Sequence, residues 1–67
     1  MIADRFRELR RRHALTQRAL AQRASLSMMC ICLIEQGLRD PMAETIRRVC
    51  RATGADANWL LEVDTHE

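Results

Sequence analysis

The chain has 67 residues, which excludes more than one domain of ordinary size. Hydrophobic residues make up 48% of it, but only Phe6 and Trp59 are aromatic, and Ala, Leu and Arg dominate. Because these three are good helix formers, the composition predicts an all-α domain. No apolar run is long enough to cross a bilayer, and the first residues lack an apolar targeting segment. We therefore expect a cytoplasmic protein that does not bind membranes.

The net charge of +2 conceals an uneven distribution. Residues 1–54 hold all eleven arginines and five acidic residues, a net charge of +6, whereas residues 55–67 hold four acidic residues and no basic ones. A basic body of this kind favours a polyanionic partner. The complete absence of lysine is explained more simply by a GC-rich genome than by phosphate recognition.

The first 27 residues predict two helices and a turn. The first helix is expected over about 3–13, and the second begins after Thr16, a good N-cap, and ends near Ala24. Residues 25–27 are expected to form the turn that follows, and Leu26 to fill the space between helices. The inward-facing residues are expected to be Phe6, Leu9, Leu20, Ala21 and Ala24.

A third helix is predicted over residues 28–36, capped by Ser27 and ended by Gly37. Helical spacing places Ile31, Ile34 and Glu35 on its inward face. The residues at 28, 29, 32 and 33 then face outward, and these are Met28, Met29, Cys32 and Leu33.

Two more helices complete the predicted domain. One is expected over about 43–53, with Gly54 ending it, and a short one over 57 to about 63, capped by Asp56. Trp59 and Leu61 in the last helix are expected either to complete the core or to cover a contact on a two-fold axis. The domain is thus predicted over 1–63, and residues 64–67 are expected to form a frayed acidic tail. The buried stripe of the helix over 43–53 is expected to be Ile46, Val49 and Cys50.

Several short motifs occur in a characteristic order along nearly the whole chain. They are Leu15-Thr16-Gln17, Leu20-Ala21, Leu26-Ser27, Ile31, Ile34-Glu35, Gly37, Pro41, Glu44-Thr45, Gly54 and Asn58-Trp59-Leu60-Leu61. In this order and spacing the chain resembles the phage repressor and Cro (Xre-like) helix-turn-helix family. The resemblance implies a compact five-helix DNA-binding domain, with the helix-turn-helix formed by the second and third helices. The family usually has glycine at the position of Ser25, so the resemblance also implies that Ser25 turns the chain in the left-handed conformation, at some cost in strain.

The resemblance implies that the helix over 28–36 enters the DNA major groove and that its outward residues read bases. Met28, Met29, Cys32 and Leu33 occupy the family's base-reading positions. None of them offers a strong hydrogen-bond donor or acceptor, so bidentate recognition of guanine or adenine is not available from them. Contact with thymine methyl groups, phosphate contacts and DNA shape remain as the means of recognition.

The resemblance also implies which residues contact the DNA backbone. Gln17 opens the second helix, where it would lie against a phosphate beside the positive end of that helix, and Arg39 follows the third helix. Arg10 is the third expected phosphate contact, and it matches one member of a pair that would join it to Glu35. The alternative for Arg10 is a simply exposed side chain.

These observations predict a sequence-specific DNA-binding transcriptional regulator, a repressor that acts as a homodimer on a two-fold operator. The alternative is a helix-turn-helix-shaped protein-interaction module whose apolar third helix binds a protein partner. A groove for an effector is a further explanation of that apolar face, although nothing in the sequence indicates a small-molecule effector. We find no nucleophile–base pair, carboxylate dyad or glycine loop, so we expect neither enzymatic activity nor a cofactor.

The sulfur-containing residues admit a metal interpretation that the helix geometry disfavours. Met28, Met29, Cys30 and Cys32 resemble a soft-metal set, but thiols two residues apart on a helix point about 200° away from each other. We therefore predict no metal site. Cys32 is a possible site of oxidation, although no activating pattern accompanies it, and Cys50 is expected to be a small core residue.

Overall fold

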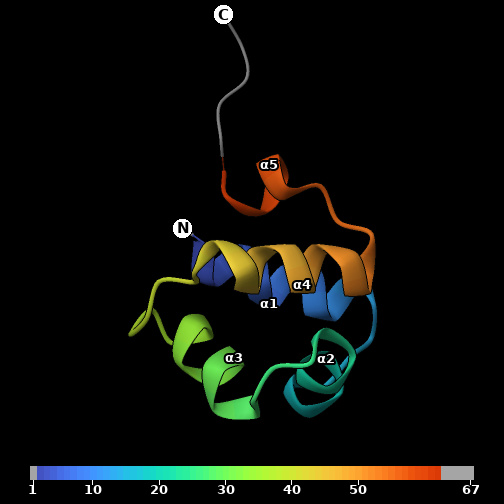
Figure 1. The fold of residues 1–67 in the computed structure, drawn as a ribbon, viewed down its shortest axis with the longest axis vertical. Coiled ribbons are helices and arrows are strands. Elements are labelled where there is room, and N and C mark those ends of the chain that lie inside the picture. Colours follow the sequence, from blue (N-terminus) through green and yellow to red (C-terminus); the bar gives the residue numbers. More distant parts are fainter. Residues whose placement is uncertain (1, 63–67) are drawn as a thin grey trace, which may run out of the picture.

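The computed structural model describes residues 2–62, and this part of the chain contains five helices and no strand (Figure 1). The helices are α1 (Ile2–Arg12), α2 (Gln17–Ala24), α3 (Met28–Glu35), α4 (Ala43–Thr53) and α5 (Ala57–Leu60). The predicted all-α fold is therefore confirmed. Met1 and residues 63–67 lie outside the described residues, and with them the predicted tail over 64–67 and the predicted last residue of the fifth helix.

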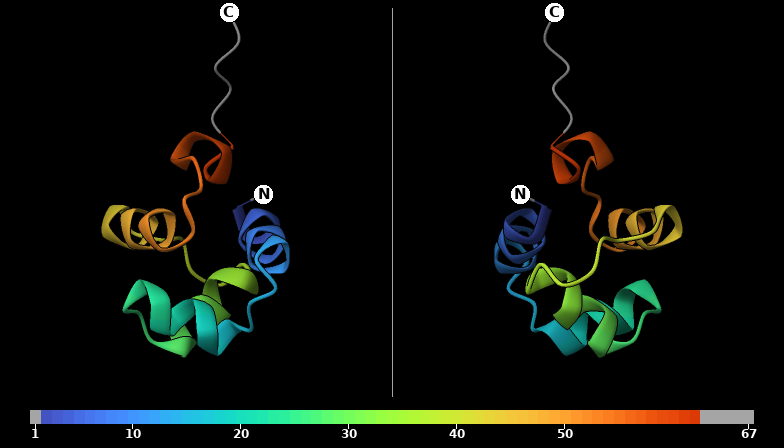
Figure 2. Two further views of the ribbon diagram at one scale, coloured as in Figure 1. Left: turned by 90° about the vertical axis from the view of Figure 1, so that its right-hand side faces the viewer. Right: turned by 90° about the vertical axis from the view of Figure 1, so that its left-hand side faces the viewer.

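All five helices pack around one small hydrophobic core. Figure 2 shows α1 and α4 nearly end-on at two sides of the molecule, with α2 and α3 below them and α5 above. Helices of 4 to 11 residues are at best marginal on their own, so packing must stabilise them. The core has at least one fully buried side chain from each helix: Phe6, Leu20, Ile31, Ile34, Val49 and Leu60.

The helix termini follow from local hydrogen bonds. The side chains of Thr16, Ser27 and Asp56 accept hydrogen bonds from the backbone N–H groups of Ala19, Cys30 and Asn58, at 3.0, 3.1 and 3.1 Å. These caps satisfy donors that the first turn of a helix leaves without partners. They explain why α2, α3 and α5 begin where the sequence predicts.

The ends of three helices differ slightly from the prediction. α1 covers residues 2–12 instead of 3–13, and α3 ends at Glu35, one residue early, with Gln36 as its C-cap. α5 ends at Leu60 instead of near residue 63. Glu62 has a φ of 57°, which a right-handed helix cannot contain.

The buried stripe of α4 shares two of its three residues with the predicted one. Ile46 and Val49 are buried as expected, but the third buried member is Thr45, and Cys50 is only half-buried at the edge of the core. The interpretation of Cys50 as a core residue was therefore only partly correct. Helical spacing allows either stripe, and the position of α4 against its neighbours selects between them.

Trp59 fastens α5 to α1 and is half-buried against the core. The guanidinium groups of Arg5 and Arg12 lie 4.7 and 4.6 Å from its ring centroid, and Arg5 also donates a hydrogen bond of 3.0 Å to the Trp59 carbonyl. Cation–π contacts of this kind hold the short last helix in place. Leu61 is 44% exposed, so the two candidate core residues of this segment have different environments.

Ser25 turns the chain between α2 and α3 in the left-handed conformation, with φ 57° and ψ 43°. The Leu26 N–H donates to the Ala21 carbonyl at 2.8 Å, and Leu26 packs against the core. The turn is thus closed by backbone hydrogen bonds and by one apolar side chain. A residue with a Cβ atom pays for this conformation in strain that glycine would avoid.

We expect Ser25→Gly to stabilise the fold. The left-handed conformation costs a non-glycine residue about 1–2 kcal/mol, and glycine gives back roughly 0.5–1 kcal/mol through its more flexible unfolded state. The net gain of about 0.5–1 kcal/mol corresponds to a rise of roughly 2–8 °C in a thermal melt. Ser27→Gly is the control, because Ser27 has a φ of −76° and caps α3. A melting temperature of Ser25→Gly at or below that of the parent protein would contradict the strain.

Candidate nucleic-acid interface

The two helices α2 and α3 form the unit on which the interface depends. Each has eight residues, and a turn over residues 25–27 joins them. α3 packs against both α1 and α2, so its inward face is covered. Ile31, Ile34 and Glu35 are the buried residues of that face, as the sequence predicted.

The outward face of α3 is most exposed at its first turn. Met28 is 47% exposed and Met29 is 63% exposed. Cys32 and Leu33, one turn further along, are half-buried. The structure therefore presents the N-terminal turn of α3 to the outside more fully than its second turn.

Gln36 adds a polar group to this face that the sequence analysis missed. It is exposed, and its Nε2 donates to the Cys32 Sγ at 3.4 Å. The spacing of three and four residues from Leu33 and Cys32 would have identified it, because such residues share a helix face. As an amide, Gln36 offers the donor and acceptor that the other four residues lack.

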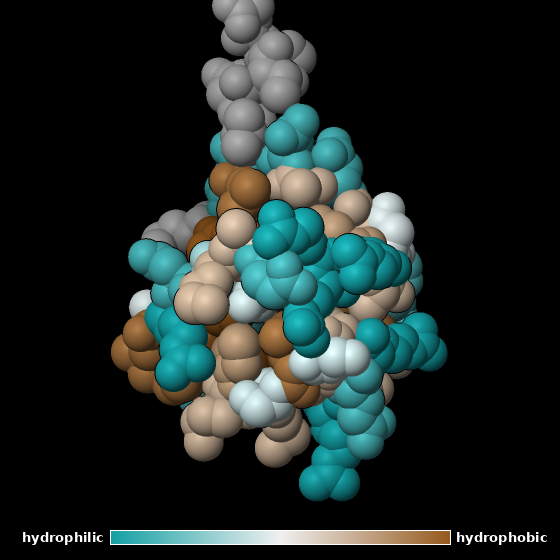
Figure 3. All heavy atoms as spheres, viewed as in Figure 1, coloured by the Kyte–Doolittle hydropathy of each residue, from teal (hydrophilic) through white to brown (hydrophobic). Residues whose placement is uncertain are grey.

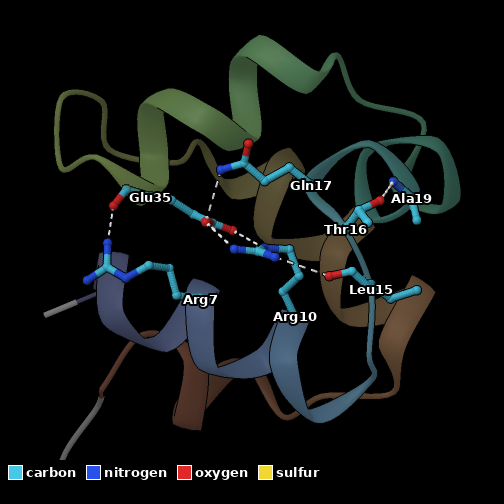
Figure 4. Close-up of polar contacts among 7 residues, drawn as sticks. All are labelled: Arg7, Arg10, Leu15, Thr16, Gln17, Ala19 and Glu35. Carbon is cyan, nitrogen blue, oxygen red and sulfur yellow. Dashed lines mark hydrogen bonds and ion pairs between the residues drawn. The ribbon is translucent and has the colours of Figure 1, made fainter.

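A buried carboxylate joins three elements behind the outward face (Figure 4). Glu35 is only 4% exposed, and Arg10 approaches it with two parallel hydrogen bonds. The distances are 2.8 Å from Nε to Oε2 and 3.0 Å from Nη2 to Oε1. The hydrogen bond to Glu35 raises the pKa of Arg10 above its ordinary value, so this arginine stays charged.

Gln17 and Arg7 complete the contacts around Glu35. The Gln17 Nε2 donates to the Glu35 Oε1 at 3.1 Å, and Arg7 donates to the Glu35 carbonyl and to Asp4. Arg10 also donates to the Leu15 carbonyl at 3.2 Å. The start of α2 and the end of α3 are therefore held together on α1 by hydrogen bonds.

The three residues predicted to contact phosphates occupy different environments. Arg10 and Gln17 are half-buried and bound to Glu35, whereas Arg39 is exposed and makes no hydrogen bond or ion pair with residues 2–62. Their role at phosphates stays a prediction. Sequence reasoning paired Arg10 with Glu35 but did not include Gln17 in that network.

The surface arginines fall into two groups. Arg12, Arg47 and Arg48 pair with glutamates on their own helices, and such exposed pairs contribute little to stability. A second group finds no ion pair within the described part of the chain, so its positive charge is uncompensated. This group consists of Arg11, Arg18, Arg23, Arg39 and Arg51.

The three cysteines are free thiols. Among residues 2–62, no three His, Cys, Asp or Glu side chains lie close enough together to hold a metal ion. Burial raises the pKa of the Cys50 thiol, and the nearby Asp56 adds to that effect. None of the described helices combines the length and hydrophobicity that a membrane span requires.

A family model described as a helix-turn-helix domain matches residues 2–61, which is most of the chain and includes all five helices. The chain belongs to this helix-turn-helix family. No curated protein and no solved structure matches it. Membership agrees with the resemblance to Xre and Cro-like regulators and indicates DNA binding, and the family is typically without enzymatic activity.

We expect Glu35→Ala to destabilise this helix-turn-helix domain far more than Glu44→Ala. Removing Glu35 leaves the half-buried Arg10 without its partner, at a cost of about 3 kcal/mol. That loss corresponds to more than about 10 °C in a thermal melt. Glu44 is exposed and pairs only with Arg47 and Arg48 of its own helix, so its removal should change the melting temperature little.

Glu35→Gln provides the conservative comparison, since it keeps the size of the side chain and removes the charge. It should fall between the parent protein and Glu35→Ala. A melt that ranks Glu44→Ala below Glu35→Ala would remove the buried pair from the account of stability.

Proposed function

We propose that this domain is a sequence-specific DNA-binding transcriptional regulator that inserts the first turn of α3 into the major groove. The observation that carries the proposal is the division of α3 into two faces. Its inner face is fixed by Ile31, Ile34 and Glu35, and its outer face is uncovered at Met28 and Met29. A helix presented in this way on a helix-turn-helix scaffold fits the groove.

The chemistry of α3 favours sites rich in A·T pairs. Met28, Met29, Cys32 and Leu33 offer apolar surface, which suits the methyl group of thymine. Gln36 supplies one amide, the group that pairs with adenine, at the far end of the helix. Discrimination between sequences is therefore expected to be modest, and phosphate contacts and DNA shape supply the remainder.

The phosphate contacts are proposed to come from the start of α2 and from the loop after α3. The free N–H groups in the first turn of α2 and its positive dipole end favour a phosphate beside Gln17. Arg10 holds Gln17 in place through their common acceptor, Glu35. Arg39 is exposed and uncompensated, so it can contact the backbone directly.

The regulator is proposed to act as a homodimeric repressor. A helix of eight residues touches few base pairs, so two copies on half-sites one helical turn apart are needed for useful affinity. Occupation of such an operator would block polymerase, and no effector is required for that mechanism.

The second candidate is a protein-interaction module. It is favoured by the apolar character of the exposed residues on and after α3: Met28, Met29, Leu38 and Met42. Methionine is enriched at protein interfaces relative to the rest of the surface. Under this candidate the same face of α3 binds a protein partner instead of bases.

The first test measures binding to random duplex DNA at several salt concentrations. The uncompensated arginines and the apolar α3 predict that phosphate contacts dominate, so log affinity should fall with log salt at roughly −0.9 per neutralised phosphate. Sequences selected from the pool should be enriched in A·T pairs. No retardation of any duplex at low salt, or an affinity that does not respond to salt, would favour the protein-interaction candidate.

The second test replaces the most exposed residues of α3. Met28→Gln with Met29→Gln should leave the melting temperature nearly unchanged, because surface changes usually fall within about 0.5 kcal/mol. The same pair of changes should alter which bases are preferred under α3, because an amide pairs with adenine whereas methionine contacts the thymine methyl group. Met42→Gln is the matched control, since Met42 is 71% exposed and lies outside α3, and it should leave the preference unchanged. An unaltered preference in the double variant would exclude Met28 and Met29 from base recognition.

A further inference from the structure

A second basic feature lies between the end of α2 and the outer side of α4. A pocket of about 350 Å³ opens there, and none of its residues belongs to α3 or to the proposed DNA contacts. Figure 3 shows hydrophilic side chains gathered over α4 on this side of the molecule. The pocket is lined by Arg23, Ala24, Ser25, Glu44, Arg48, Arg51 and Ala52.

The charges around the pocket leave two guanidinium groups without compensation. Glu44 is its only acidic residue, and it accepts hydrogen bonds from Arg47 and from Arg48. Those hydrogen bonds lower the pKa of Glu44, and its negative charge is balanced by Arg47 and Arg48. Arg23 and Arg51 find no hydrogen-bond or ion-pair partner within residues 2–62. Both are exposed, so their guanidinium groups are available to an anion that enters the pocket.

Two hydrogen bonds hold the Arg48 side chain in place at one side of the pocket. Its Nε donates to the Glu44 Oε2 at 3.0 Å, and its Nη1 donates to the Ser25 carbonyl at 3.1 Å. The second bond occupies a carbonyl at the C-terminal end of α2, which would otherwise repel an anion. Small side chains at Ala24 and Ala52 leave room between the arginines.

We propose that this pocket binds a phosphate group held by the guanidinium forks of Arg23 and Arg51 and by the remaining Nη2 group of Arg48. The planar fork of a guanidinium matches the oxygens of a phosphate, and an ionised acceptor makes the strongest hydrogen bonds that arginine can form. The volume admits a phosphate ester. The group comes either from a free phosphorylated molecule or from the backbone of bound DNA, and the two sources share this chemistry. The proposal stands independently of base recognition by α3.

The test follows the Nε–H signals of the arginine side chains by NMR. Inorganic phosphate, and separately pyrophosphate, are added at constant ionic strength against chloride. The signals of Arg23, Arg48 and Arg51 should shift and saturate. Arg51→Gln should weaken binding about tenfold, the loss of one charged hydrogen bond.

Arg11→Gln is the matched control. Arg11 and Arg51 are both exposed, both lie in the last turn of an eleven-residue helix, and both find no ion-pair partner among the described residues. The control should bind phosphate like the parent protein. Shifts that do not saturate, or equal affinities of the two variants, would overturn the site.

A short duplex then identifies the source of the phosphate. If the duplex shifts the same three signals and Arg51→Gln weakens duplex binding more than Arg11→Gln, the phosphate belongs to the DNA backbone. If the duplex leaves the three signals unchanged while inorganic phosphate saturates them, the ligand is a free phosphorylated molecule. Because the phosphate titration contains no DNA, failure of the protein to bind duplexes would not affect it.

Discussion

The arrangement of the first three helices depends on the hydrogen bonds that the buried carboxylate of Glu35 accepts. A charge buried to this extent must be compensated by nearby donors, because the interior does not solvate it. Arg10 supplies two hydrogen bonds from α1, and Gln17 supplies one from the start of α2. Because α3 is only about two turns long, these donors fix its orientation relative to α1 and α2.

This constraint separates the two ends of α3. Its C-terminal end is bound to α1 through Glu35, whose carbonyl also accepts from Arg7. Its N-terminal turn is held by the Ser27 cap and by the buried Ile31, and it presents Met28 and Met29 outward. A helix whose inward face is fixed along its length presents the same outward residues in the same orientation each time it meets a partner. Such preorganisation reduces the entropic cost of binding.

The positive charges of the domain attract a polyanion but do not determine which base sequence it prefers. Four arginines pair with acidic residues on their own helices, and the five whose side chains find no ion pair or hydrogen bond within residues 2–62 lie on α1, α2, α4 and the loop after α3. Long-range attraction to a polyanion does not depend on which bases it carries. With an apolar α3, sequence preference must arise from shape and methyl contacts, and this limits how sharply the domain can discriminate.

Much of the fold could be predicted from the sequence because its determinants are local. Thr16, Ser27 and Asp56 cap helices through hydrogen bonds two or three residues away, and the apolar spacing of α2 and α3 identifies their inward faces. The first residues of α2, α3 and α5 were therefore predicted correctly. The left-handed conformation of Ser25 was expected from the family resemblance, because the family usually has glycine at that position.

Tertiary structure alone decided which side chains lie opposite each other. Helical periodicity states that residues share a face, but not what that face meets. The amide of Gln17 therefore lies on Glu35, Thr45 takes the place expected for Cys50, and Trp59 packs under two arginines of α1. The pocket between α2 and α4 likewise joins residues 23–25 with residues 44–52. Such contacts depend on how the helices are placed around the core, and no local pattern in the sequence encodes that placement.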